Sequence, residues 1–278
     1  MYKITKVINN NFVSSFDENK NEIILRGPGI GFQKKSNDEI DDNKIEKVYS
    51  MSSKNTLNKL QTLVDDIPLE HIQVCTEIIE VIKKNLKKRL NDNIYITLTD
   101  HLSFAIERKL LKLEYTNALL WEIKNFYNQE YQLGLHALDL IEEKLGIRLI
   151  EDEAGFIALH IVNAELDTQM SDMMQITTLI HEILDITKDY YQMKFDEDSL
   201  HYERFITHLK YFGQRLFQNK TVKDEDFQLQ KMIKSNYNAD YQCAERINQY
   251  IKEKFHRELT GEEMMFLTIH LKRITMND

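Results

Sequence analysis

Proline and glycine are scarce in this 278-residue chain, which has two prolines and eight glycines. Long stretches are therefore free to be helical. The two cysteines, Cys75 and Cys243, match no metal or disulfide spacing, and we expect both to be reduced thiols. No apolar run approaches the ~18 residues of a membrane span, and the first residues lack the apolar stretch of a signal peptide. We expect a cytoplasmic protein without stable membrane insertion.

Charge is unevenly distributed along the chain. The net charge of −9 argues against nonspecific nucleic-acid binding by the whole molecule. Residues 1–35, however, hold six basic and three acidic side chains. A basic head on an acidic body is compatible with a polyanion partner confined to the N-terminus.

Two segments of the chain repeat each other. Residues 151–160 are echoed by residues 261–270, a shift of 110 positions, and His101 is matched by His208 after a shift of 107. The aligned pairs in the first match include Glu153 and Glu263, Phe156 and Phe266, and His160 and His270. Each copy therefore holds two histidines about sixty positions apart. A duplicated unit that retains both histidines indicates a duplicated chemical function.

The body of the chain has helical periodicity from residue 69 onward. Gly146 is expected to end one helix, and Thr260 with Glu263 predicts a capping box at the last. We expect Thr99 to cap a helix that starts just before His101. Each copy is predicted to be a bundle of about five helices, with a polar connector at residues 50–66 and a junction near residues 167–172. The expected helices begin near residue 69 and then cover residues 99–111, 118–126, 135–145, 173–188, 202–217, 227–233, 244–255 and 261–274.

The first fifty residues show short alternating segments instead. We expect strands within residues 2–8, 12–16, 22–25 and 44–49, with a hairpin turn at residues 17–20. So small an antiparallel sheet has a small core, so we expect a homodimer to complete it.

Two segments of this module carry candidate chemistry. Asn9, Asn10 and Asn11 place three amides at a strand end, and residues 27–35 add a glycine-rich loop with an aromatic ring and two lysines. Amides for base edges, a ring for stacking and lysines for phosphates are the components of RNA recognition. An asparagine turn and a plain hairpin loop explain the same residues. A dinucleotide fingerprint does not, because no helix follows the glycines.

The N-terminal module closely resembles the co-antiterminator RNA-binding domain of BglG/SacY/LicT-type transcriptional antiterminators. The resemblance is carried by three segments, Lys3–Asn11, 27–35 (GPGIGFQKK) and 45–48 (IEKV). Those proteins continue with two PTS regulation domains, as the duplication would require. The resemblance implies a small antiparallel β RNA-binding domain at residues 1–55, a linker at 56–66, and two all-α helical-bundle domains at 67–170 and 171–278.

The resemblance also implies an RNA-binding set. Many relatives carry a basic residue between the first two loop glycines, where this chain has Pro28, so RNA affinity or target preference is expected to differ. The implied RNA-binding residues are Asn9, Asn10, Asn11, Arg26, Gly27, Gly29, Phe32, Gln33 and Lys34.

Paired histidines in such regulation domains accept phosphoryl groups. The residues alone leave core histidines or a metal site open, although no ligand set with metal spacing accompanies them. The resemblance implies that modification of the first domain, through a sugar-specific permease (enzyme II), inhibits the protein. The resemblance likewise implies that modification of the second domain by the phosphocarrier HPr activates it. The implied phosphorylation sites are His101, His160, His208 and His270.

These inferences predict a regulator rather than an enzyme, with no cofactor and no metal. It would stabilise a leader-mRNA hairpin and thereby prevent termination of a sugar-utilisation operon. One alternative is a DNA-binding activator with the same regulation domains, which would carry an N-terminal helix-turn-helix. The other is a His-dependent hydrolase or metalloenzyme, for which no nucleophile motif or ligand cluster is present.

Overall fold

The computed structural model describes residues 2–50, 53–86, 88–218 and 227–276. Contacts divide the chain into two units, Met1–Leu120 with Tyr127–Asp167, and Trp121–Phe126 with Thr168–Asp278. Within the described residues, no helix is long and apolar enough to cross a membrane. One boundary between the two units falls after Asp167, and Trp121–Phe126 is assigned to the second unit.

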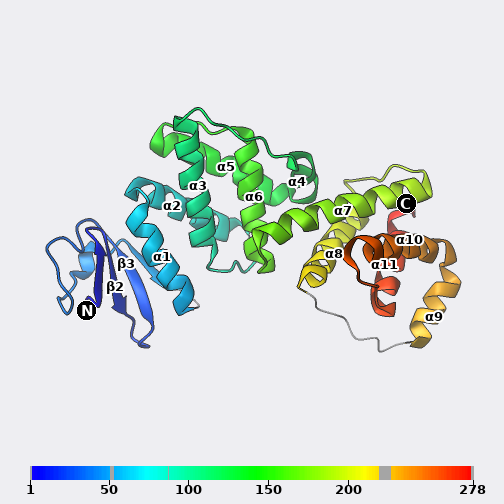
Figure 1. Cartoon of the computed structure of the whole chain (residues 1–278), viewed down its shortest axis with the longest axis horizontal. Helices are drawn as coiled ribbons and strands as arrows, with labels where there is room; N and C mark the ends of the chain where they lie inside the picture. Colours follow the sequence, from blue (N-terminus) through cyan, green and yellow to red (C-terminus); the bar gives the residue numbers. More distant parts are fainter. Residues whose placement is uncertain (1, 51–52, 87, 219–226, 277–278) are drawn as a thin grey trace. The chain divides into compact units, whose positions relative to one another are not determined.

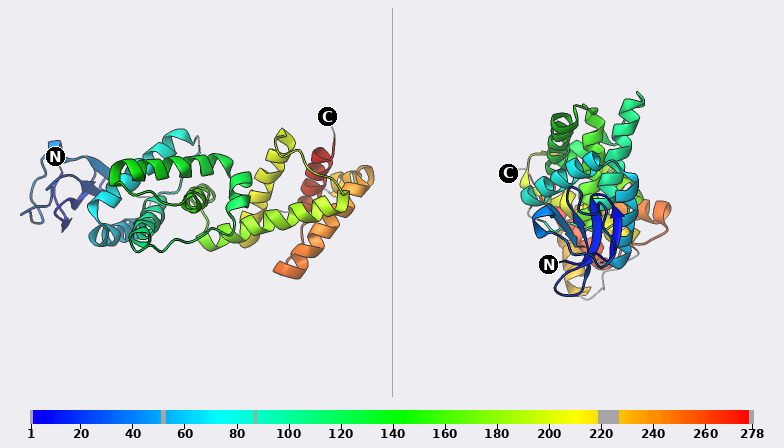
Figure 2. Two further views of the ribbon diagram at one scale, coloured as in Figure 1. Left: turned by 90° about the horizontal axis from the view of Figure 1, so that it is seen from above. Right: turned by 90° about the vertical axis from the view of Figure 1, so that its left-hand side faces the viewer.

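The N-terminal module is a four-stranded antiparallel sheet in the order β1-β2-β3-β4, coloured blue in Figures 1 and 2. The predicted β2–β3 hairpin is confirmed, and the Asp17 carboxylate accepts hydrogen bonds from the backbone of its turn. The last strand starts later than predicted because Asp42–Lys44 forms a 3-10 turn (η1). The strands are β1 (Lys6–Asn9), β2 (Phe12–Phe16), β3 (Glu22–Arg26) and β4 (Lys47–Ser50).

Both faces of the sheet are covered within one chain. One face packs on the loop residues Ile30 and Ile40. The other face is covered by helix α1 (Lys54–Asp66), as Figure 1 shows. From this helix, Gln61 Nε2 donates to Ser14 Oγ over 2.8 Å. Helix α1 therefore supplies part of the core that a partner was predicted to supply, and the homodimer stays a prediction.

Helix α1 occupies most of the segment that was predicted to be a polar connector. Residues 51 and 52 of that segment lie outside the described residues. Leu57, Leu60 and Val64 are buried and recur at intervals of three and four residues, which places them on one helix face. The same spacing is present in the sequence, but the many polar residues between these three positions led to the prediction of a connector instead of a helix.

The described part of the first helical repeat contains five helices, as predicted. Helix α3 starts at Ile94 rather than beside His101, because Ile94 and Leu98 are buried and Asn91 Oδ1 accepts the N–H of Asn93 over 2.8 Å. Thr99 therefore lies inside the helix and is not its cap. Gly146 ends α5 in the left-handed conformation with φ +69°, as predicted. The helices are α2 (Leu69–Asn85), α3 (Ile94–Leu110), α4 (Leu120–Phe126), α5 (Asn128–Leu145) and α6 (Glu151–Leu166).

The second repeat also contains five helices in its described part. Its last helix has the predicted bounds and the predicted capping box between Thr260 and Glu263. The other helices begin two to six residues earlier than predicted, except α9. They are α7 (Met170–Tyr191), α8 (Leu200–Phe217), α9 (Phe227–Asn236), α10 (Asn238–Phe255) and α11 (Gly261–Ile274).

Candidate functional site

The three asparagines between β1 and β2 have different roles. Asn9 Oδ1 accepts the N–H groups of Asn11 and Phe12, at 2.9 and 3.0 Å, and Asn11 Oδ1 accepts the N–H of Gly29 at 3.0 Å. These two amides hold the turn and the neighbouring loop together. The side chain of Asn10 is exposed, and within the described residues its amide makes no hydrogen bond. Asn10 is thus the amide that is available to an external partner.

The glycine-rich loop is held against this turn by close backbone contacts. The N–H of Gly31 donates to the carbonyl of Asn10, and the N–H of Gly27 donates to the carbonyl of Asn11, both at 3.0 Å. A Cβ on Gly31 would lie 2.3 Å from a backbone oxygen of the turn, so no larger residue fits. Phe32 follows directly and is 58% exposed. An exposed ring and an exposed amide therefore belong to one rigid pair of loops.

The remaining residues of the predicted RNA-binding set divide into exposed and inward-facing ones. Gln33 and Lys34 are exposed beside Phe32. Arg26 is different, since its side chain is 13% exposed and lies 3.5 Å from the carboxylate of Glu46. Its guanidinium is mostly buried and is paired with Glu46 in this structure.

In the first repeat, the two predicted histidines face each other from α3 and α6. The rings of His101 and His160 are 4.9 Å apart, and His101 Nε2 lies 3.0 Å from Glu153 Oε2. Burial lowers the pKa of His160 well below its usual value, and a charge on His101 lowers it further. The imidazole of His160 is therefore neutral near pH 7.

In the second repeat, the rings of His208 and His270 are 4.1 Å apart, on α8 and α11. His208 is exposed, whereas His270 is buried and stacks on Phe205. Burial lowers the pKa of His270 to about 4, aided by the charges of His208 and Arg273. Partial desolvation of the His208 ring lowers its pKa, and the positive charges of Arg215 and Arg273 lower it further. Both imidazoles are therefore unprotonated near neutral pH, the form in which a ring nitrogen is a nucleophile.

Comparison with known proteins identifies this combination of domains. A model described as the CAT RNA binding domain matches residues 2–58, and one described as the PRD domain matches residues 76–164 and 181–274. Transcription antiterminator LicT of Bacillus subtilis (strain 168) is 46% identical over 98% of each chain. This chain belongs to the CAT–PRD family of transcription antiterminators. The β-glucoside operon antiterminator of Dickeya chrysanthemi is 43% identical, over 98% of this chain and 96% of the relative.

A solved structure supports the same assignment. The crystal structure of GlcT CAT-PRDI aligns with 59% of this antiterminator and 98% of its own chain, at 35% identity and a TM-score of 0.53. The predicted family and the predicted fold, a small β RNA-binding domain followed by two all-α repeats, are confirmed. The DNA-binding alternative required an N-terminal helix-turn-helix, and the described N-terminal module is a β-sheet instead. The individual RNA-binding and phosphorylation residues stay predictions.

The structure adds two arginines that the sequence analysis missed. Arg108 Nη2 lies 2.8 Å from Glu153 Oε1, on the carboxylate that also contacts His101. Arg215 lines a pocket of about 190 Å³ with His208 and His270. Each arginine follows its histidine by seven residues, so the same 107-residue shift that paired the histidines would have found them.

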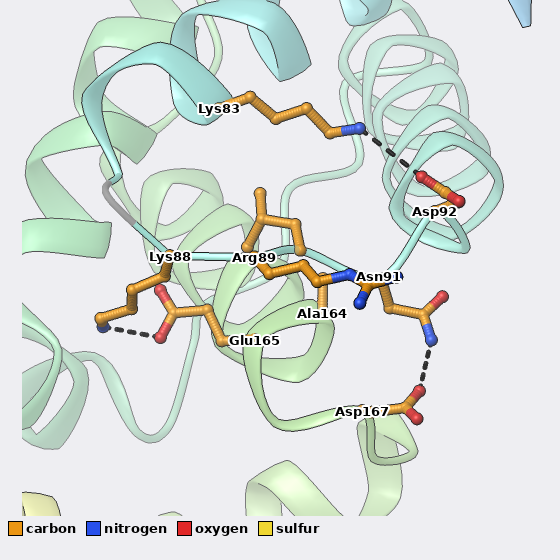
Figure 3. Close-up of a pocket in the computed structure, with 9 residues that line it drawn as sticks. Lys83, Lys88, Arg89, Asn91, Asp92, Ala164, Glu165 and Asp167 are labelled. Carbon is orange, nitrogen blue, oxygen red and sulfur yellow. Dashed lines mark hydrogen bonds and ion pairs between the residues drawn. The ribbon is translucent and has the colours of Figure 1, made fainter. Parts of the chain in front are cut away.

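A second, polar pocket of about 720 Å³ lies between the loop after α2 and the end of α6 (Figure 3). Lys88 Nζ donates to Glu165 Oε2 at 2.7 Å and to Glu130 Oε1 at 3.1 Å, so one cation holds two buried carboxylates together. Burial and the charge of Glu130 raise the pKa of Glu165 to about 7. The Glu165 carboxyl therefore keeps its proton to higher pH than an ordinary glutamate, and the cluster joins three segments of the first repeat.

Proposed function

We propose that this antiterminator binds a leader-mRNA hairpin through Asn10 and Phe32 and thereby prevents termination of a sugar-utilisation operon. The observation that carries the proposal is the joint exposure of these two side chains on loops that are hydrogen-bonded to each other. The ring offers a stacking surface and the amide offers a donor and an acceptor to a base edge. We propose that Lys34, exposed two residues after Phe32, contacts a phosphate, in exchange for the 3.3 Å hydrogen bond that its Nζ donates to the carbonyl of Glu39.

Binding of the full chain to short imperfect RNA hairpins and matched DNA hairpins tests this proposal. Asn10→Ala and Phe32→Ala are each expected to weaken RNA binding about 10-fold or more, because a base stack on an aromatic ring contributes ~1–3 kcal/mol. Asn19→Ala and Phe16→Ala are matched controls, since both residues are exposed, Asn19 in the β2–β3 hairpin turn and Phe16 at the end of β2 beside it. Equal binding of RNA and DNA hairpins by the wild type would refute the proposal.

The control of this activity is proposed to lie in the four paired histidines. HPr would phosphorylate His208 and His270 and activate the protein, whereas the sugar-specific permease would act through His101 and His160 and inhibit it. Each phosphoryl group adds roughly −1.5 to −2 charge. Such a charge beside a packed helix pair changes which subunit packing is stable, and we propose that the affected assembly is a homodimer.

RNA binding measured with and without phospho-HPr tests the activating part. His208→Ala with His270→Ala is expected to abolish the gain in RNA affinity that phospho-HPr produces in the wild type. The control is His136→Ala, in the first repeat and outside both histidine pairs. A gain that persists in the double variant would contradict the assignment.

A further inference from the structure

One carboxylate bridges a histidine and an arginine in the first repeat. The two oxygens of Glu153 are divided between His101 Nε2, at 3.0 Å, and Arg108 Nη2, at 2.8 Å. Arg108 is buried, and the rings of Phe104 and Tyr115 lie 4.9 and 4.6 Å from its guanidinium carbon. The guanidinium of Arg108 is therefore close enough to the imidazole of His101 for one anionic group, here the Glu153 carboxylate, to contact both.

The second repeat has the same histidine and arginine but a different partner for the carboxylate. Glu263, which matches Glu153, contacts Arg257 Nη2 at 2.8 Å and accepts the backbone N–H of Thr260 at 3.1 Å as part of the capping box. Within the described residues, the buried Nε of Arg215 has no hydrogen-bond partner, as is also true of Nε of Arg108. The difference is that no carboxylate in the described part of the chain is paired with Arg215, whereas Glu153 is bound to Arg108. Arg215 and His208 line the same pocket, which Phe266 helps to enclose.

The electrostatics of the second site are consistent with this difference. Partial desolvation of the ring against the pocket lowers the pKa of His208, and the positive charges of Arg215 and Arg273 lower it further. A field of this sign disfavours an imidazolium and favours an anion at the same place. The pocket thus combines a neutral nucleophile with positive charge and, at Glu263, a carboxylate that is already bound elsewhere.

We propose that Arg215 binds the phosphoryl group carried by His208, and that Arg108 does so for His101 only after Glu153 has been displaced. This inference rests on the proposed role of these histidines as phosphoryl acceptors. A guanidinium presents two parallel N–H donors to a phosphate, which the ammonium of a lysine does not. In the first repeat the incoming phosphoryl group takes the place of the bridging carboxylate. In the second repeat no carboxylate has to leave.

The transfer itself needs no further reactant. The unprotonated ring nitrogen of His208 forms a bond to phosphorus as the bond from phosphorus to the donor's histidine nitrogen breaks. The donor imidazole keeps that electron pair, and each imidazole retains the proton on its other nitrogen. Arg215 takes no part in bond formation. It acts as a positioning residue that stabilises the transferred group.

The test uses the full chain and two phosphoryl donors, phospho-HPr and the small molecule phosphoramidate. Phosphoramidate transfers its phosphoryl group to a histidine nitrogen and releases ammonia, without any docking of a carrier protein. Mass spectrometry would locate the modified histidines, and the loss of phosphate after donor removal would give the lifetime at each site. Circular dichroism would verify that each variant is folded.

Arg215→Gln is expected to shorten the lifetime of phospho-His208 about 10-fold or more, since hydrogen bonds to charged groups contribute ~1.5–3 kcal/mol. Arg215→Lys should restore part of it. Arg204→Gln, an exposed arginine on the same helix, is the matched control and should leave the lifetime unchanged. In the first repeat, Glu153→Gln should increase the yield of phospho-His101, a gain that a folding defect does not produce.

The outcomes separate this inference from the function on which it rests. Absence of phosphate on His208 of the wild type with either donor would overturn the proposed acceptor role, and the inference with it. A modified wild type whose lifetime is unaffected by Arg215→Gln would overturn the inference alone. An effect of Arg215→Gln on the rate with phospho-HPr, but not with phosphoramidate or on the lifetime, would also overturn it, because Arg215 would then contact the carrier.

Discussion

Asn9 Nδ2 donates a hydrogen bond of 2.8 Å to the backbone carbonyl of Val64, 55 residues further along the chain. The same amide accepts two N–H groups of its own turn through Oδ1. The asparagine turn of the RNA-binding domain is thus tied to the last turn of α1. Asn9 acts in the fold, whereas Asn10 beside it faces solvent.

Asn9→Ala is therefore expected to destabilise the protein by about 1–3 kcal/mol, because three hydrogen bonds are lost and buried groups are left unpaired. Asn10→Ala should leave the thermal unfolding midpoint unchanged while weakening RNA binding. Differential scanning calorimetry with RNA-binding assays on the same samples checks both. Asn9→Asp keeps the acceptor and loses only the donor to Val64, so its unfolding midpoint should lie between those of the wild type and Asn9→Ala. Equal midpoints for the two alanine variants would show that this division of roles is wrong.

Gly27→Ala is expected to disrupt the glycine-rich loop. The added Cβ would lie 1.7 Å from the backbone oxygen of Lys44, and a backbone atom has little freedom to move away. We expect a loss of roughly 2 kcal/mol or more in the free energy of unfolding, together with loss of RNA binding. Gly146→Ala is the control: its Cβ would meet nothing within 4 Å, and only the strain of φ +69° remains, at about 1 kcal/mol. Denaturant unfolding would compare them, and a smaller effect at Gly27 than at Gly146 would contradict the expected clash.

Glu165 should make stability depend on pH in the direction opposite to most carboxyls. Its pKa is raised from its usual 4.5 to about 7, so between these values the folded state holds a proton that the unfolded state releases. The contribution of Glu165 to stability is therefore fully present below pH 4.5 and is lost as pH rises to about 7. Glu165→Gln should flatten this part of the stability profile, whereas Glu143→Gln, 69% exposed, should not. Unfolding curves between pH 4.5 and 8 would test this, and unchanged slopes would refute it.

His270 should contribute a dependence of the other sign. Its pKa is lowered from its usual 6.5 to about 4, so the unfolded state binds a proton first as the pH falls. Stability from the neutral ring is fully present above pH 6.5 and decreases between pH 6.5 and about 4. NMR titration of the imidazole should show His270 uncharged at pH 5.5. Observation of an imidazolium at that pH would contradict the burial that the structure shows.

Several features of this antiterminator are local, and the sequence alone determined them. The β2–β3 hairpin follows from the turn residues after Phe16, the end of α5 follows from Gly146, and the start of α11 follows from Thr260 and Glu263. The duplicated histidines were also evident from matching segments. Each signal involves residues within a few positions of one another, or a direct repeat of letters, so neither needs knowledge of the packing.

The partners of the site residues were decided only by the tertiary structure. Glu153 contacts His101 and Arg108, which are 52 and 45 residues away, and the matching Glu263 contacts Arg257 instead. A repeat in the sequence predicts that equivalent residues exist in both copies, but it does not predict which neighbouring side chain each carboxylate contacts. That selection depends on how α6 packs against α3, and on the loop before α11, where small differences in position exchange one hydrogen-bond partner for another.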